Sequence, residues 1–247
     1  PFPAGRLLRR AIALLAMTEY PRRLLLREVM VKLPLRLRPV GDAAILAEYD
    51  ARDIALANRH VLGLMRALAE ARPAGIVDVS PAYHTLLVFF DPLALPPAAA
   101  AEVVAAADRR ADIEHAAEGP IVEIEVSYGG ADGPDLPDVA RHTGLSEAEV
   151  VARHSGGLYM VMLVGFMPGF AYLAGLDPRL ATPRLATPRR EVPTGSVGIG
   201  GDQTGIYPAP LPGGWRLIGR TGLTLYDPHR DPPTLLRAGD RVRFVPV

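Results

Sequence analysis

The sequence contains no cysteine in its 247 residues. This absence excludes disulfide bonds, a thiolate nucleophile and every zinc site that is built on cysteine. A chain of this length without cysteine suits a cytoplasmic protein, and that is the location we predict.

The chain also lacks an excess of charge of either sign, because Lys plus Arg and Asp plus Glu number 27 each. A nucleic-acid-binding protein normally carries a basic surplus, so we predict no nucleic-acid partner. The six histidines are scattered and form no H-x-x-x-H pair. We therefore predict no metal site.

One long uncharged run is present, "GLYMVMLVGFMPGFAYLAGL" over residues 157–176. About 20 apolar residues can cross a bilayer. However, "GFMPGF" interrupts this run with glycine and proline, which are unfavourable inside a helix. The run therefore predicts a buried strand over residues 158–166, followed by a turn at Pro168-Gly169, and no membrane span.

Residues 33–118 alternate between strand and helix patterns. Short strands are predicted at 35–41, 43–49, 75–80 and 84–90, with helices after Asp53 and over residues 96–113. Two helices over one antiparallel sheet form an α+β sandwich, of which the ferredoxin-like fold is one form.

The second part, residues 119–247, begins and ends on alternating strands, 121–128 and 240–247. Two short helices are predicted between them, the second with a capping box at Ser146 and Glu149 and a stop at Gly156. Twelve of the 24 glycines and eight prolines lie between Gly165 and Gly222. Short strands joined by tight turns, as in a closed barrel, fit this composition.

The first 32 residues are different, since they are rich in arginine and begin with proline. We predict that residues 1–32 are an atypical extension and that the natural start lies near Met30.

Two familiar motifs fail in the glycine-rich region. "GSVGIGGDQTG" lacks the GK[ST] of a phosphate-binding loop. Ser196 is out of register for a G-x-S-x-G nucleophile. What remains is a set of polar and aromatic residues on glycine turns: His154, Tyr159, Phe166, Phe170, Tyr172, Arg184, Arg189, Arg190, Gln203, Thr204, Tyr207, Trp215, Arg220 and Thr221.

Structural alternatives exist for several of these residues. His154 could bind the terminal carbonyls of its helix, and Trp215 could belong to the core. The arginines of "PRLATPRR" could be solvated, although guanidinium groups held between prolines suit carboxylates and phosphates.

Longer stretches of the sequence resemble a known family. These are "HSGGLYMVMLVGFMPGFAYLAGLD", "TPRREVPTGSVGIGGDQTGIYP", "PGGWRLIGRT" and "AGDRVRFVPV", with "RPVGDAAILAEY" and "PAYHTLLVFFDP" in the first half. They resemble the family of 5-oxoprolinase B subunits (PxpB), also called allophanate hydrolase subunit 1, which includes the kinase inhibitor KipI. The resemblance extends from Leu33 to Val247.

The resemblance implies a ferredoxin-like domain over residues 33–118 and a cyclophilin-like β-barrel over residues 119–247. It implies two protein partners, a C subunit of the allophanate hydrolase subunit 2 type and an A subunit of the LamB/YcsF type. Such a set opens 5-oxo-L-proline to L-glutamate at the expense of ATP, which a partner could bind or share. The isolated chain is not expected to be active.

On this hypothesis Arg220 and His154 are the predicted catalytic residues. The predicted substrate-binding residues are Phe166, Phe170, Arg189, Gln203, Thr204, Tyr207 and Trp215. Two other functions fit the same resemblance: inhibition of a sensor histidine kinase, or a carboxyltransferase component of a biotin-dependent urea or amide carboxylase.

Overall fold

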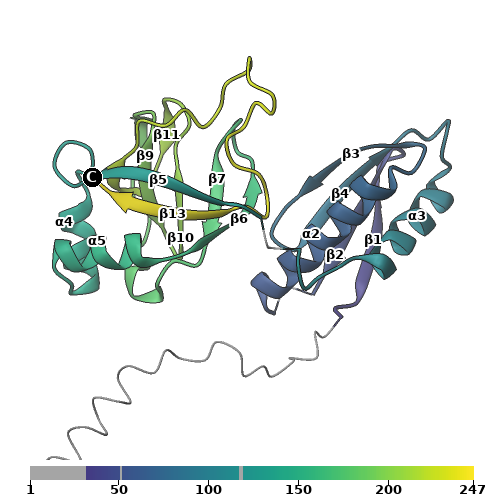
Figure 1. Ribbon diagram of the computed structural model, residues 1–247, viewed down its shortest axis with the longest axis horizontal. Coiled ribbons are helices and arrows are strands. Elements are labelled where there is room, and N and C mark those ends of the chain that lie inside the picture. Colours follow the sequence, from purple (N-terminus) through teal and green to yellow (C-terminus); the bar gives the residue numbers. More distant parts are fainter. Residues whose placement is uncertain (1–31, 51, 117–118) are drawn as a thin grey trace, which may run out of the picture. The chain divides into compact units, whose positions relative to one another are not determined.

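The computed structural model describes residues 32–50, 52–116 and 119–247 (Figure 1). The extension predicted for residues 1–32 lies outside this range except for Lys32. Residues Leu33–Val247 form one compact unit, which contains an N-terminal sheet with two helices and, after it, a barrel.

The described residues of the N-terminal part form four strands and two helices. In chain order they are β1 (Leu35–Val40), β2 (Ala44–Tyr49), α2 (Ile54–Ala71), β3 (Ile76–Pro81), β4 (Thr85–Phe90) and α3 (Pro97–Arg110). The strands pair in the order β1-β2-β4-β3, and every pair is antiparallel. This is the predicted α+β arrangement of two helices and one antiparallel sheet.

The predicted helix starts and the core follow from local sequence. The Asp53 side chain caps α2 by accepting a hydrogen bond from the Leu56 N–H at 3.0 Å, and Pro97 opens α3 where its missing N–H does no harm. The apolar face of α2, including Val61 and Leu64, packs with Leu86 and Val88 of β4 in one buried cluster.

The barrel part contains nine strands, two helices and a short 3₁₀ turn. They are β5 (Ile121–Tyr128), α4 (Leu136–Thr143), α5 (Glu147–Gly156), β6 (Tyr159–Val164), β7 (Ala171–Ala174), η1 (Pro178–Leu180), β8 (Arg189–Val192), β9 (Ser196–Gly200), β10 (Gln203–Ile206), β11 (Leu211–Gly213), β12 (Arg216–Arg220) and β13 (Arg241–Pro246). Seven strands close in the order β10-β7-β6-β13-β5-β12-β9, while β11 and β8 form a separate pair.

Alternating sequences explain which side chains fill the barrel. In β5, Ile124 and Val126 are buried and the intervening Glu125 is exposed. In β13, which pairs with β5 in parallel, Phe244 is buried and Arg243 is exposed. Closure of the sheet agrees with the cyclophilin-like barrel predicted for this part.

The uncharged run is a hairpin of this barrel. Its first half is β6, which pairs with β7 on one side and with β13 on the other. Among the described residues, no helix is long and apolar enough to cross a membrane.

Helix α5 begins and ends where its sequence predicts. Ser146 Oγ accepts from the Glu149 N–H, and the Glu149 carboxylate accepts from the Ser146 N–H at 2.9 Å. This reciprocal pair is the predicted capping box, and Gly156 is the last helical residue.

Candidate functional site

A polar cleft lies at one end of the barrel and contains Arg220, the predicted catalytic arginine. Its volume is about 510 Å³. It is lined by Glu125, Ser127, Asp132, Thr194, Pro208, Arg220, Thr221, Gly222, Leu223, Thr224 and Val247. Five chain segments therefore meet here: β5 with the loop after it, the turn before β9, the residues after β10, the end of β12 with the loop after it, and the C-terminal Val247.

Backbone hydrogen bonds at Gly195 join the turn before β9 to the residues after β10 and to the loop after β12. The Gly195 N–H donates to the Tyr207 carbonyl at 2.7 Å, and its carbonyl accepts from the Thr221 N–H at 2.9 Å. Gly195 has φ +79°, and a Cβ at this position would collide with the Thr221 carbonyl oxygen. Only glycine allows this approach, so the turn in "PTGSV" fixes Thr194 beside Arg220.

Arg220 is held at one side and open at the other. Its Nε donates to the Thr194 carbonyl at 2.9 Å, while Asp132 Oδ1 lies 4.0 Å from Nη1. Its side chain is 46% exposed. A guanidinium fork with unsatisfied N–H groups can bind a carboxylate or a phosphate through two bonds. Ser127, Thr194 and Thr221 also line the cleft, and Glu125 and Asp132 add acceptors for an N–H donor.

The predicted aromatic residues form a separate cluster next to this cleft. The Phe170 ring lies 5.3 Å from Tyr207 and 5.7 Å from Trp215, both in edge-to-face contact. All three rings are buried with Val192, Leu211 and Leu217. Trp215 is therefore a core residue, the alternative that its chemistry allowed. The cluster supports the cleft through Tyr207, whose carbonyl holds the Gly195 turn.

Trp215 has a glycine beneath its ring and an arginine above it. A Cβ on Gly200 would collide with the indole, including Nε1. The Arg184 guanidinium carbon lies 5.9 Å from the ring centroid, within the range of a cation–π contact.

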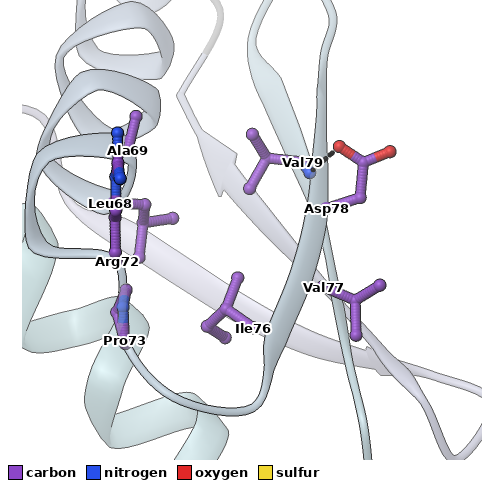
Figure 2. Close-up of a pocket in the computed structure, with 8 residues that line it drawn as sticks. All are labelled: Leu68, Ala69, Arg72, Pro73, Ile76, Val77, Asp78 and Val79. Carbon is purple, nitrogen blue, oxygen red and sulfur yellow. Dashed lines mark hydrogen bonds between the residues drawn. The ribbon is translucent and has the colours of Figure 1, made fainter.

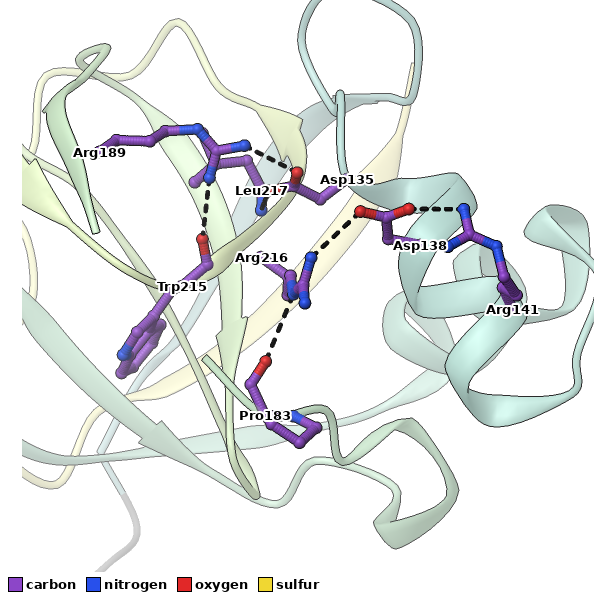
Figure 3. Close-up of polar contacts among 8 residues, drawn as sticks. All are labelled: Asp135, Asp138, Arg141, Pro183, Arg189, Trp215, Arg216 and Leu217. Atoms are coloured by element: carbon purple, nitrogen blue, oxygen red, sulfur yellow. Dashed lines mark hydrogen bonds and ion pairs between the residues drawn. The ribbon is translucent and has the colours of Figure 1, made fainter. Parts of the chain in front are cut away.

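Arg189 does not lie in the cleft but in an ion pair that links β8 to the start of α4 (Figure 3). Its Nη2 donates to Asp135 Oδ1 at 2.7 Å. The other carboxylate oxygen of Asp135, which is buried, accepts from the Leu217 N–H at 2.7 Å. A second, more exposed set joins Asp138 to Arg141 and Arg216.

His154 is fully buried between α5 and the barrel wall. Thr204 Oγ1 donates to the Gly198 carbonyl at 2.9 Å, so it must accept from His154 Nε2, which is 2.9 Å away. The other ring nitrogen, Nδ1, then accepts from the Tyr128 hydroxyl at 2.7 Å. Both nitrogens are therefore occupied, and the ring stacks on Phe244 at 4.6 Å.

This environment determines the charge of His154. Burial lowers the pKa of the imidazole to about 3, so the ring is neutral at physiological pH. Neither His154 nor its partner Thr204 lines the Arg220 cleft.

We expect His154 to make the fold sensitive to mild acid. In the unfolded chain the His154 imidazole takes up a proton near pH 6.5, whereas in the folded chain it does so only near pH 3. The free energy of unfolding therefore falls as the pH decreases from 6.5 to 3. Between pH 6.5 and 4.5 the loss should be about 2 kcal/mol, from a limiting slope of about 1.4 kcal/mol per pH unit.

Urea unfolding at several pH values in this range measures the effect. His154→Gln should remove most of the dependence of the unfolding free energy on pH. His142→Gln, at an exposed position on α4, should retain that dependence. An equal pH dependence of the unfolding free energy in wild type and in His154→Gln would show that His154 is not the group responsible.

The last two predicted residues lie elsewhere. Gln203 exchanges hydrogen bonds with the Tyr83 hydroxyl at 2.8 and 3.1 Å and lines a different hollow from Arg220. Phe166 is 68% exposed on the loop between β6 and β7. The predicted site is thus divided among the cleft, the aromatic cluster, the His154 network, the ion pair of Arg189 and two outlying positions.

Sequence reasoning missed several cleft residues, among them Asp132, Thr194 and Ser127. Thr194 precedes Gly195, a glycine with positive φ. A glycine turn at this point was the one feature of the sequence that could have indicated Thr194, because such turns join the ends of barrel strands. Asp132 and Ser127 carried no such signal.

Another hollow, of about 240 Å³, lies between the end of α2 and β3 (Figure 2). Leu68 and Ile76 line it. Its carboxylate, Asp78, accepts a local bond from the Val79 N–H. Because it offers few convergent polar groups, the hollow is a weaker candidate than the Arg220 cleft. Within the described residues no cluster of three or more His, Asp or Glu side chains is placed to hold a metal ion.

The family described as "carboxyltransferase domain, subdomain C and D" matches residues 35–236. The fold and this match define a carboxyltransferase-domain protein. The chain is 44% identical over 209 residues to the 5-oxoprolinase B subunit of Escherichia coli O157:H7, and the match covers 84% of this chain and 94% of the relative. It is 41% identical over 226 residues to the protein of that name from Bacillus subtilis strain 168, covering 86% and 92%. The chain therefore belongs to the family of 5-oxoprolinase B subunits.

A solved structure, that of TTHA0988, resembles the chain with a TM-score of 0.72 and 41% identity. The match covers 86% of this chain but only 40% of that protein. TTHA0988 thus carries a comparable module within a much longer polypeptide.

Proposed function

We propose that this chain is the B subunit of an ATP-dependent 5-oxoprolinase, which opens 5-oxo-L-proline to L-glutamate together with its A and C subunits. The observation that carries the proposal is the similarity to the E. coli B subunit, which covers 84% of this chain and 94% of that protein. A cytoplasmic location is part of the proposal, since the reaction consumes ATP.

The Arg220 cleft suits one part of this chemistry. The substrate has a carboxylate and a lactam, and a lactam is an unactivated amide. We propose that the Arg220 guanidinium binds the carboxylate. The cleft hydroxyls and the Asp132 carboxylate are then available to the lactam group. Fixed donors of this kind need no rearrangement as charge develops.

The cleft does not fit ATP. A triphosphate carries several negative charges and needs several cationic or N–H donors, whereas Arg220 is the one cationic side chain among the residues that line this cleft, which is enough for a single carboxylate. We therefore propose that ATP is bound by one of the partner proteins and not in this cleft.

Six of the remaining predicted residues are proposed to act indirectly. Phe170, Tyr207 and Trp215 support the loop that carries Thr194, and Arg189 holds the Trp215 region to α4 through its ion pair. His154 and Thr204 join α5 to β9 and β10. These are positioning roles, since none of these six residues lines the cleft.

The test is reconstitution with omission. Labelled 5-oxoproline is incubated with ATP and all three subunits, and each of them is then left out in turn. We expect glutamate only from the full set, and a complex of this chain with the C subunit that buries more than about 1,000 Å². Full activity without this chain would contradict the proposal.

A carboxyltransferase component of a biotin enzyme is the second candidate, favoured by the description of the matching family. It predicts a biotinylated partner and inhibition by avidin. Glutamate production that is insensitive to avidin would favour the oxoprolinase.

We also propose the domain limits 33–118 and 119–247 and a ferredoxin-like N-terminal domain. The antiparallel order β1-β2-β4-β3 supports it, because the same strand neighbours result when the ferredoxin-like βαββαβ order is entered at its last strand.

A further inference from the structure

Arg220 and Asp132 carry opposite charges side by side in the cleft. Asp132 Oδ1 lies 4.0 Å from Arg220 Nη1, which is beyond hydrogen-bonding distance. The Asp132 side chain is 39% exposed and that of Arg220 is 46% exposed. Within the described part of the chain, no hydrogen bond reaches the Asp132 carboxylate. Both groups therefore keep hydrogen-bonding capacity for a ligand of the cleft.

The turn that carries Asp132 is fixed to the strand that ends at Arg220. A hydrogen bond from the Gly133 N–H to the Gly129 carbonyl closes this turn at 2.7 Å. The Gly129 N–H donates in turn to the Ile218 carbonyl of β12 at 3.0 Å. A Cβ on Gly133 would collide with the same carbonyl, so glycine is needed for this close approach. Main-chain contacts on both sides of Asp132 therefore place its backbone beside the end of β12.

Arg220 is fixed by two further contacts. Its backbone pairs with Ser127 of β5, and its Nε donates to the Thr194 carbonyl at 2.9 Å. Nε is thereby occupied, whereas neither Nη group donates a hydrogen bond to any of the described residues. A carboxylate that binds these Nη groups would lie next to the Asp132 carboxylate. The two negative charges would repel each other unless the ligand also brings a hydrogen-bond donor to Asp132.

We propose that Asp132 determines substrate specificity by accepting a hydrogen bond from the ring N–H of 5-oxoproline, while Arg220 binds the carboxylate. This inference rests on the proposed function. The ring nitrogen and the carboxylate of 5-oxoproline are bonded to the same carbon, so the substrate presents a donor and an acceptor side by side, as the two side chains require. The substrate class is accordingly a cyclic amide with a carboxylate next to its N–H. An anion that lacks this N–H is disfavoured by the Asp132 charge.

Competition by a carbocyclic analogue tests the inference in the reconstituted set of three subunits with ATP and labelled 5-oxoproline. In 3-oxocyclopentane-1-carboxylate a methylene group replaces the ring N–H, while the carboxylate and the ring carbonyl are kept. We expect its inhibition constant against wild type to exceed the KM for 5-oxoproline at least about tenfold. The reason is that a site built to accept from a substrate N–H rejects an analogue without that donor.

Variants of Asp132 assign this discrimination to its carboxylate. Asp132→Ala should raise the KM for 5-oxoproline about tenfold, whereas the inhibition constant of the analogue should stay the same or fall, because the charge that repels its carboxylate is removed. Asp132→Asn retains an acceptor oxygen without the charge and should give an intermediate KM. Glu123→Ala is the matched control and should change neither constant. Glu123 is 60% exposed, pairs with Arg243 at 3.1 Å and does not line the cleft.

The outcomes separate the inference from the proposed function. If the wild-type set of subunits produces no glutamate, the proposed function fails. If that set is active and Asp132→Ala raises the KM and the inhibition constant by the same factor, Asp132 only positions Arg220, and the inference is overturned. Unchanged constants in Asp132→Ala, or equal constants for substrate and analogue in wild type, would overturn it as well, and the proposed function would stand.

Discussion

Replacement of Arg220 by alanine should lower ATP-dependent opening of 5-oxoproline by the reconstituted subunits about 100-fold or more. Loss of one fixed charged donor at a reacting group has effects of this size. The fold should tolerate the change, because the side chain is about half exposed and makes one hydrogen bond, to the Thr194 carbonyl. We expect the free energy of unfolding to change by less than about 1 kcal/mol.

A matched control is available on β13. The Arg243 side chain is 47% exposed, against 46% for Arg220, and it forms a surface ion pair with Glu123 at 3.1 Å. Arg243→Ala should therefore leave the rate unchanged. Arg220→Lys retains the charge but loses the fork, and we expect an intermediate rate. Wild-type activity in Arg220→Ala would remove the cleft from consideration as the substrate site.

Replacement of Asp135 by alanine should lower the free energy of unfolding more than the replacement of Arg220 or of Asp138. The change deprives the Leu217 N–H of its acceptor and leaves the half-buried Arg189 without its partner. We expect a cost of about 3 kcal/mol, since breaking a buried charge pair leaves the other charge uncompensated. The melting temperature should fall by about 6–12 °C for a chain of this size.

Asp138 provides the comparison for this experiment. Its carboxylate pairs with Arg141 and Arg216, but it is 38% exposed, against 7% for Asp135. Asp138→Ala should cost less than about 1 kcal/mol, because solvent screens an exposed pair. Equal losses in the two variants, measured by urea unfolding, would show that Asp135 is not a specific link between α4 and the barrel.

The local elements were largely predictable from sequence. The alternation in residues 121–128 and 240–247 predicted β5 and β13, and the Ser146 and Glu149 capping box predicted the start of α5. The glycines and prolines after Gly165 predicted short strands, and the longest helical segment described there is the turn Pro178–Leu180. These signals work because a strand's period, a helix cap and a tight turn each depend on residues within a few positions of one another.

The grouping of site residues was less predictable. Residue type marked Arg220 and Tyr207 as members of one site, but the Tyr207 ring lies in the aromatic cluster, and only its carbonyl reaches the turn beside Arg220. Residue type gave no reason to pair Arg189 with Asp135, which is 54 residues away. His154 was predicted to be catalytic, and it stays so only as a sequence expectation, because its burial and both hydrogen bonds favour the positioning role that we propose.

The order of residues along the chain determined the fold class, the strands and helices, and, through long specific motifs, the family. Tertiary structure alone decided which charged side chains face solvent and which are neutralised by partners. An arginine or a histidine has the same formula in a cleft and in a core. Its chemistry depends on the dielectric around it and on the groups within hydrogen-bonding distance, and barrel closure brings those groups from distant parts of the chain.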